Sequence, residues 1–152
     1  MQHSLVFKVL DVLSDGKFHS GESIAKTFDI SRVSIWNAIK KAEEFGVEIY
    51  SVRGRGYKLI QPITLLKKSS IQNVMGEIHH WFNMEIFDVM ESTNSYLMER
   101  ASLDHPHASV AVTHIQTKGR GRRGRSWQSA LGESLTFSLL WRFNGGAATL
   151  SG

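Results

Sequence analysis

The sequence contains no cysteine, which excludes disulfides and thiolate-ligated zinc sites. It also contains no uninterrupted apolar run long enough to span a bilayer. The N-terminus lacks the basic region and the long apolar core of a signal peptide. These absences fit a reducing compartment, and we expect a soluble, cytoplasmic protein with no membrane partner.

The rest of the composition is balanced. Of the 152 residues, 41% are hydrophobic and 21% are charged, so disorder is not expected over most of the length. This length suits one ordinary domain or two small ones. The formal net charge of +4 favours polyanionic partners.

The first part of the chain alternates helical patterns with turn signals. An apolar stripe over residues 5–13 predicts a first helix. Ser20 and Ser31 are the expected N-caps of a second and a third helix, and Gly46 is expected just after the third.

A hairpin is predicted to follow these helices. Two β-rich runs, residues 47–52 and 57–59, are joined by an arginine–glycine tip at residues 53–56. Three helices followed by a basic-tipped hairpin are typical of a winged helix-turn-helix. We therefore assign residues 1–60 to a DNA-binding domain, and the alternative is a winged helix that binds another protein.

The third helix is the expected DNA-reading element. Its buried side is predicted from Ile35, Ile39, Ala42 and Phe45, and its opposite face is polar. Arginine and asparagine can read base edges in a major groove, and lysines neutralise phosphates. The predicted DNA-binding residues are Arg32, Ser34, Trp36, Asn37, Lys40 and Lys41 in this helix and Arg53 and Arg55 at the hairpin tip. Because three nearby glutamates offset the lysines, we expect a modest affinity that dimerisation strengthens.

Gln61-Pro62 is the predicted domain boundary, because proline cannot continue a β-ladder. We divide the chain into residues 1–60, a linker at residues 61–66 and a second domain at residues 67–152. The patterns of that domain predict, in order, a helix ending near Gly76, a strand at 85–89, a helix from the Ser92 cap to Arg100, and strands at 109–115 and 134–143. No later element covers the last strand, so we expect an incomplete α/β domain and an α+β chain overall.

Residues 117–126, here called the arginine–glycine loop, join the last two predicted strands. Three glycines separate five cationic side chains, which are Lys118, Arg120, Arg122, Arg123 and Arg125. Glycine lets a backbone turn its N–H groups toward a ligand, and arginine matches carboxylates and phosphates. Disordered RNA-binding tails have similar composition. A position between two strands, with Trp127 directly after it, favours an anion-binding loop.

The seven histidines do not predict a metal site. His79-His80 and His105-Pro106-His107 fall in predicted loops with no carboxylate at ligand spacing. We interpret them as surface residues and expect no protein-bound metal. No serine stands at a strained strand-to-helix turn either, so a serine-hydrolase triad is not predicted.

Several motifs together resemble one family. The Ser92-Thr93-Asn94 segment, then Gln116, then residues 119–127 resemble the biotin protein ligases. The N-terminal winged helix resembles that of the bifunctional members, which are also biotin operon repressors. The resemblance runs from about residue 5 to the end of the chain, and the Ser-Thr-Asn segment and the loop form a highly specific pair. It implies that the second domain is like a class II biotin ligase catalytic domain.

The resemblance implies a two-step reaction. Biotin attacks the α-phosphate of Mg²⁺–ATP, giving biotinyl-5′-AMP, and a lysine of the biotin carboxyl carrier protein then takes the biotinyl group. The adenylate is also the corepressor, because it orders loops and promotes the homodimer that binds operator DNA. Neutralising the carboxylate and triphosphate with arginines and Mg²⁺, and closing a loop against water, suits this chemistry.

By this resemblance, specific residues receive roles. The biotin-binding residues would be Ser92, Thr93, Asn94, Gln116, Gly119, Arg120, Gly121 and Arg122. The catalytic residues would be Arg120, Arg122 and Arg125, closest to the carboxylate and phosphates.

This sequence also departs from the family. Full-length members continue with a Lys-Trp-Pro-Asn-Asp segment that supplies the catalytic lysine, and this sequence has none. We therefore expect a truncated chain that shows no ligase activity alone. The alternatives are a stand-alone winged-helix regulator that senses a small anionic ligand, and an RNA-binding protein that uses the arginine–glycine loop.

Overall fold

The computed structural model describes residues 4–121, 123, 125–127, 130–143 and 145. It confirms the α+β class, with helices, one parallel strand pair and several antiparallel ones. The chain forms two compact units. The first contains the chain up to Leu65 together with Gln128–Leu135, and the second contains Leu66–Trp127 and the chain from Thr136 onward.

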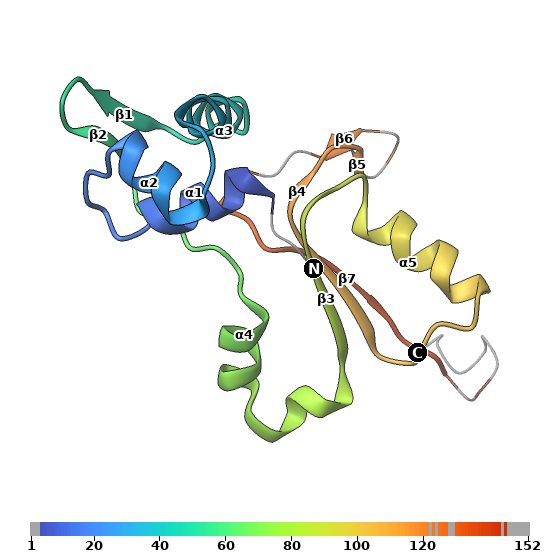
Figure 1. Cartoon of the computed structure of the whole chain (residues 1–152). Coiled ribbons are helices and arrows are strands. Elements are labelled where there is room, and N and C mark those ends of the chain that lie inside the picture. Colours follow the sequence, from blue (N-terminus) through green and yellow to red (C-terminus); the bar gives the residue numbers. More distant parts are fainter. Residues whose placement is uncertain (1–3, 122, 124, 128–129, 144, 146–152) are drawn as a thin grey trace. The chain divides into compact units, whose positions relative to one another are not determined.

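The first unit contains a winged helix-turn-helix (Figure 1). Helices α1 (Leu5–Leu13), α2 (Gly21–Phe28) and α3 (Arg32–Glu44) come first. Strands β1 (Ile49–Val52) and β2 (Gly56–Leu59) then pair in antiparallel fashion. This hairpin and its tip are called the wing below.

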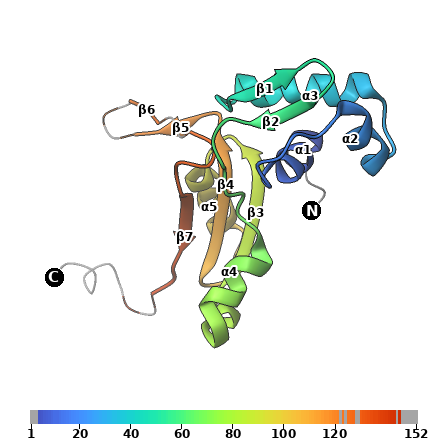
Figure 2. The ribbon, with the colours of Figure 1, turned by 90° about the vertical axis from the view of Figure 1, so that its left-hand side faces the viewer.

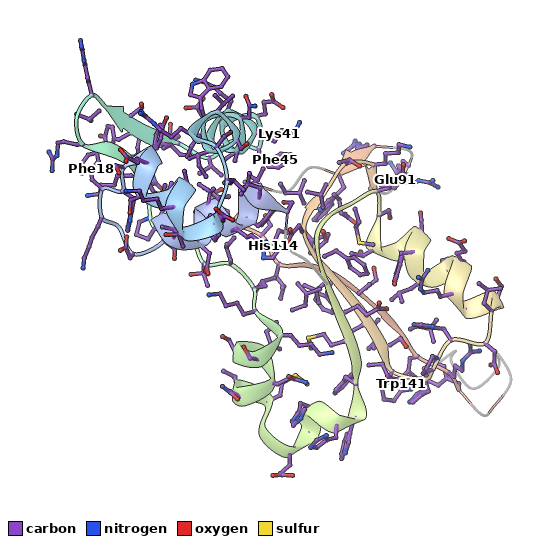
Figure 3. All side chains as sticks on the ribbon, in the orientation of Figure 1. Phe18, Lys41, Phe45, Glu91, His114 and Trp141 are labelled. Carbon is purple, nitrogen blue, oxygen red and sulfur yellow. The ribbon has the colours of Figure 1, made fainter. Side chains whose placement is uncertain are left out.

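The core of this unit is formed mainly by apolar residues of the three helices. Phe7, Leu13, Ile35 and Ile39 are each at most 2% exposed. Phe45 is only half-buried, although it was predicted to be buried; its ring centroid lies 6.4 Å from that of Phe7 (Figure 3). It follows the last turn of α3, where the chain already leaves the core.

The predicted helix caps are confirmed. The hydroxyls of Ser20 and Ser31 each accept a hydrogen bond from the backbone N–H three residues later, at 3.0 and 3.1 Å. Gly46 follows α3 with φ +83°, and the N–H of Val47 donates to a carbonyl of α3 at 3.1 Å. Because this turn uses residues 46 and 47 to end the helix, the wing begins only at Ile49 and not at the predicted residue 47.

The second unit is built on a three-stranded sheet. Its elements are α4 (Lys68–Met75), the 3-10 helix η1 (Gly76–Trp81), β3 (Asn83–Met90), α5 (Thr93–Ser102), β4 (Ser109–Gln116), β5 (Gly119–Arg120), β6 (Ser126–Trp127) and β7 (Thr136–Leu140). Central β4 runs parallel to β3 and antiparallel to β7, and α5 connects the parallel pair (Figure 2). Leu97 of α5 packs against Ala111 and Leu140 of the sheet.

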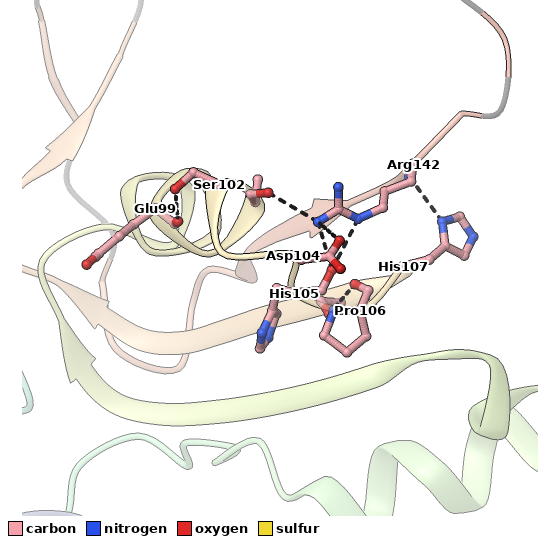
Figure 4. A network of polar contacts seen from close by, with 9 residues as sticks. Glu99, Ser102, Asp104, His105, Pro106, His107 and Arg142 are labelled. Atoms are coloured by element: carbon pink, nitrogen blue, oxygen red, sulfur yellow. Dashed lines mark hydrogen bonds and ion pairs between the residues drawn. The ribbon is translucent and has the colours of Figure 1, made fainter.

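The last sheet strand is shorter than predicted, because the chain leaves the ladder after Leu140. The backbone N–H of Arg142 donates instead to Nδ1 of His107 at 3.0 Å. Its guanidinium donates to the carbonyls of Ala101 and His105 at 3.2 and 2.9 Å (Figure 4). This residue therefore ties the end of β7 to the turn that follows α5.

Helix α4 ends before Gly76 as predicted, and η1 follows directly, which the pattern does not predict. The helix begins at Lys68, so Leu65 and Leu66 precede it. No residue of α4 is buried, and Val74 is 89% exposed. Across the described part of the chain, no helix has the length and apolarity needed to cross a membrane.

Candidate functional site

A groove of about 810 Å³ lies in the first unit between α3, the start of α2 and the wing. Arg32 and Trp36 of α3 line one side, and Arg53 of the wing tip lines another. Trp36 and Val33 are 51% and 67% exposed, so the groove combines two arginines and one acidic side chain, Glu22, with open apolar surface. This composition suits a polyanion that also offers flat or apolar faces, as nucleic acids do.

The predicted DNA-binding side chains of α3 differ in their surroundings. Arg32 and Asn37 are exposed. Ser34 is half-buried, and its backbone N–H and its hydroxyl both contact the hydroxyl of Ser31, at 3.1 and 2.9 Å. The structure thus places Ser34 in the cap of α3, where its hydroxyl already has a partner.

The two lysines near the end of α3 are ion-paired. Lys40 Nζ lies 2.8 Å from a carboxylate oxygen of Glu43, and Lys41 Nζ lies 2.6 Å from one of Glu44. Exposed pairs of this kind contribute little to stability, but they reduce the positive potential that a phosphate meets. The groove side of α3 is therefore the more cationic part of this surface.

In the second unit, the structure brings together Thr93 and Gln116, two of the residues to which the family resemblance assigns biotin binding. The Gln116 side-chain oxygen accepts hydrogen bonds from the backbone N–H and the hydroxyl of Thr93, at 2.7 and 3.1 Å. The Thr93 hydroxyl also lies 2.8 Å from that of Ser138 on β7. Because its proton goes to Gln116, the Thr93 hydroxyl must accept from Ser138.

The other residues of the Ser-Thr-Asn segment have different environments. Ser92 is buried and caps α5, accepting from the N–H of Ser95 at 3.3 Å. Asn94 is exposed. The segment therefore joins the end of β3 to α5 through a buried cap and leaves one amide side chain accessible.

Two backbone hydrogen bonds position the start of the arginine–glycine loop. The N–H groups of Thr117 and Lys118 donate to the carbonyls of Met90 and Glu91, each at 2.9 Å. Lys118 Nζ also contacts the Glu91 carboxylate at 2.6 Å, with both side chains about two-thirds exposed. These bonds hold the chain after β4 beside the chain after β3, so the loop begins next to Thr93.

The loop contains a short hairpin rather than the plain loop that the sequence predicts. Gly119 pairs with Trp127 and Arg120 with Ser126, and the N–H of Gly121 donates to the carbonyl of Arg125 at 2.7 Å. The side chains of Arg120 and Arg125 are exposed, and Trp127 is 53% exposed. Arg122 and Gly124 lie outside the described residues.

Gly119 is buried at the contact between this hairpin and Gln116. A Cβ atom there would lie 2.9 Å from the Gln116 amide nitrogen and 2.7 Å from the Trp127 carbonyl oxygen. Since the Gln116 oxygen is bonded to Thr93, its amide nitrogen is directed toward Gly119. The geometry therefore presents an amide donor beside a glycine backbone and two exposed arginines, which suits a ligand with carbonyl and anionic oxygens.

Sequence reasoning missed two polar residues of this unit, Ser138 and His114. His114 is buried, so the expectation that the histidines are surface residues is wrong for it. Its Nε2 accepts from the N–H of Leu66 at 2.9 Å, and its Nδ1 lies 3.3 Å from the Phe87 carbonyl (Figure 3). Its position inside the predicted strand at 109–115 was the signal that could have identified it.

Within the described ranges, no three His, Asp or Glu side chains gather as metal ligands would. Tyr96 on α5 is a half-buried titratable group beside the sheet. Burial raises the pKa of the Tyr96 phenol, and its hydrogen bond to the Glu85 carboxylate at 2.9 Å raises it further. This pair joins α5 to β3, about one helical turn after Thr93.

Two family models match the chain. A model described as "HTH domain" matches residues 6–58, and one described as "Biotin/lipoate A/B protein ligase family" matches residues 86–150. The chain is 33% identical over 150 residues to the Escherichia coli protein named "Bifunctional ligase/repressor BirA", covering 99% of this chain and 45% of that protein.

Proteins of the same name from Salmonella typhimurium and Bacillus subtilis are 35% and 34% identical over 144 and 133 residues. These matches cover 95% and 83% of this chain and 43% and 39% of the relatives. The chain thus spans less than half the length of the curated relatives that it matches.

Proposed function

Because this chain belongs to the biotin protein ligase and biotin operon repressor family, with an N-terminal winged helix, we propose that it carries two functions of that family. The first unit binds operator DNA. The second unit provides part of the site that forms and holds biotinyl-5′-AMP. The observation that carries the second proposal is the orientation of Gln116 by Thr93 next to Gly119.

The proposed DNA surface is the groove side of α3 together with the wing. Arg32, Trp36 and Arg53 line this groove, and Asn37 is exposed elsewhere on α3. An arginine that binds phosphate adds affinity for every sequence, whereas one that contacts a guanine edge adds specificity. Dimerisation of the protein would double this surface and strengthen binding to a two-fold symmetric operator.

An Arg32→Ala variant is expected to bind mixed-sequence duplex DNA about tenfold more weakly. The slope of the logarithm of the binding constant against the logarithm of the salt concentration is expected to become shallower by about one. The matched control is Lys68→Ala on α4, which removes the same charge from an exposed residue that does not line the groove. Fluorescence anisotropy at two salt concentrations measures the affinity and its salt dependence for the 152-residue parent chain and for each variant. Equal losses in the two variants would contradict a specific role for the groove.

For the adenylate, we propose that the Gln116 amide and the backbone of the hairpin hold the biotinyl end. Arg120, Arg122 and Arg125 would neutralise the carboxylate and phosphate as they approach each other. Trp127, now half exposed, would be covered when the loop closes and would help to exclude water from the mixed anhydride.

Mg²⁺ would enter the site with ATP, bound to its triphosphate. It would supply charge neutralisation on the phosphates. Transfer of the biotinyl group to a carrier-protein lysine is proposed for the family's full-length form rather than for these 152 residues alone.

Biotinyl-5′-AMP is expected to slow tryptic cleavage within the arginine–glycine loop by at least about tenfold, because a bound loop must open before it is cut. Cleavage at Lys67 and Lys68, outside the site, is the internal control. Mass spectrometry of the timed digest measures both rates.

Unchanged cleavage at saturating adenylate would contradict the proposed site. Equal protection by inorganic pyrophosphate alone would favour a regulator that senses a small anion. Protection by single-stranded RNA, and none by the adenylate, would favour an RNA-binding protein.

A further inference from the structure

Phe18, in the connection between α1 and α2, lies beneath two cations of the wing. The guanidinium carbon of Arg55 is 4.2 Å from the Phe18 ring centroid, and Lys58 Nζ is 5.9 Å from it (Figure 3). Phe18 is half-buried, while Arg55 is exposed. The ring thus supports the wing tip from the side of the α1–α2 connection.

The backbone holds this ring in place. His19, the next residue, makes an isolated antiparallel bridge with Tyr57 of β2: its N–H donates to the Tyr57 carbonyl at 2.9 Å, and its carbonyl accepts from Tyr57 at 2.8 Å. The His19 ring contacts the Asp15 carboxylate at 3.0 Å, and the N–H of Lys17 donates to the same carboxylate at 2.9 Å. Phe18 is therefore fixed relative to β2 by main-chain bonds on its C-terminal side.

The two arginines of the wing tip consequently have different environments. Arg53 lines the groove shared with Arg32 and Trp36. Arg55 is not among the groove's lining residues and stacks on Phe18 instead. The wing therefore presents one arginine toward the groove and a second one at a separate position.

We propose that Phe18 is a positioning residue for DNA binding, which holds Arg55 ready to contact a phosphate at a second point outside the groove. This inference rests on the proposed DNA-binding function. Stacking occupies the face of a guanidinium, while its N–H donors lie in the plane and can still reach a phosphate. A side chain restrained beforehand loses less rotamer freedom when the DNA binds.

A double-mutant cycle on the 152-residue chain tests this role, with mixed-sequence duplex DNA as the probe. Arg55→Ala is expected to weaken binding about fivefold, and Phe18→Leu about threefold. In the Arg55→Ala background, Phe18→Leu is expected to have no further effect. Phe18→Tyr, which keeps the aromatic face, is expected to bind like the parent chain.

Arg55→Lys gives a second measurement that leaves the Phe18 packing intact. It keeps the charge but loses the planar stack, so it is expected to weaken binding about twofold while the salt dependence stays that of the parent chain.

If Phe18→Leu lowers affinity equally with and without Arg55, Phe18 has only a structural role and the proposal is overturned. If the parent chain and Arg32→Ala both fail to bind duplex DNA, the proposed DNA-binding function itself is wrong, and this inference fails with it.

Discussion

A Gly56→Ala variant is expected to lose most of its DNA affinity and to melt well below the parent chain. Gly56 has φ +97°, and a Cβ atom there would lie 2.0 Å from the His19 carbonyl oxygen and 2.6 Å from Ser20 Cα. These are backbone atoms, so the clash is relieved only by breaking the bridge between His19 and Tyr57. The free energy of unfolding is expected to fall by about 4 kcal/mol or more, because backbone strain and the loss of two hydrogen bonds combine.

Gly54→Ala is the matched control in the same wing tip. Gly54 also has a positive φ, +81°, but nothing lies within 4 Å of its would-be Cβ. Only the left-handed backbone penalty of about 1–2 kcal/mol applies. Thermal unfolding followed by circular dichroism compares the stability of the two variants, and anisotropy on duplex DNA compares their affinity. Similar losses of stability and affinity at both positions would show that backbone conformation, and not the approach to His19, decides the effect.

Local signals explain why the first unit was well predicted from the sequence. Ser20, Ser31 and Gly46 act within three or four residues of their own positions, so capping rules identify them directly. The approach of Gly56 to His19 joins residues that lie 37 positions apart in the chain. No periodicity encodes that contact, and the different roles of Arg53 and Arg55 depend on it.

The second unit was predicted in its order of elements but not in its contacts. The parallel pairing of β3 with β4 brings Thr93 next to Gln116, 23 residues later in the chain. Antiparallel β7 then adds Ser138 to the same network. The motif indicated Thr93 and Gln116 only through family resemblance, whereas Ser138 could be found only from the register of the strands.

A Gly119→Ala variant is expected to bind biotinyl-5′-AMP at least about 100-fold more weakly while keeping the fold of both units, because small displacements in a positioned site have effects of this size. The added Cβ would lie 2.7 Å from the Trp127 carbonyl oxygen, 3.1 Å from Trp127 Cβ and 2.9 Å from the Gln116 amide nitrogen. Relief of these contacts separates β5 from β6 or turns the Gln116 amide away. Either movement removes the donor that Thr93 orients toward the ligand.

Gly121→Ala, two residues further along the same hairpin, distinguishes this effect from a general intolerance of the loop. Its Cβ would lie 3.4 Å from the Arg125 carbonyl oxygen, which is ordinary contact, so ligand binding is expected to fall by no more than about twofold. Protection of the loop from trypsin by biotinyl-5′-AMP, titrated for both variants, measures the difference. Equal losses of affinity in the two variants would mean that the ligand needs glycine throughout the hairpin. Equal retention of affinity would mean that Gln116 does not face the ligand. In either case, the orientation of Gln116 by Thr93 could no longer carry the proposed function.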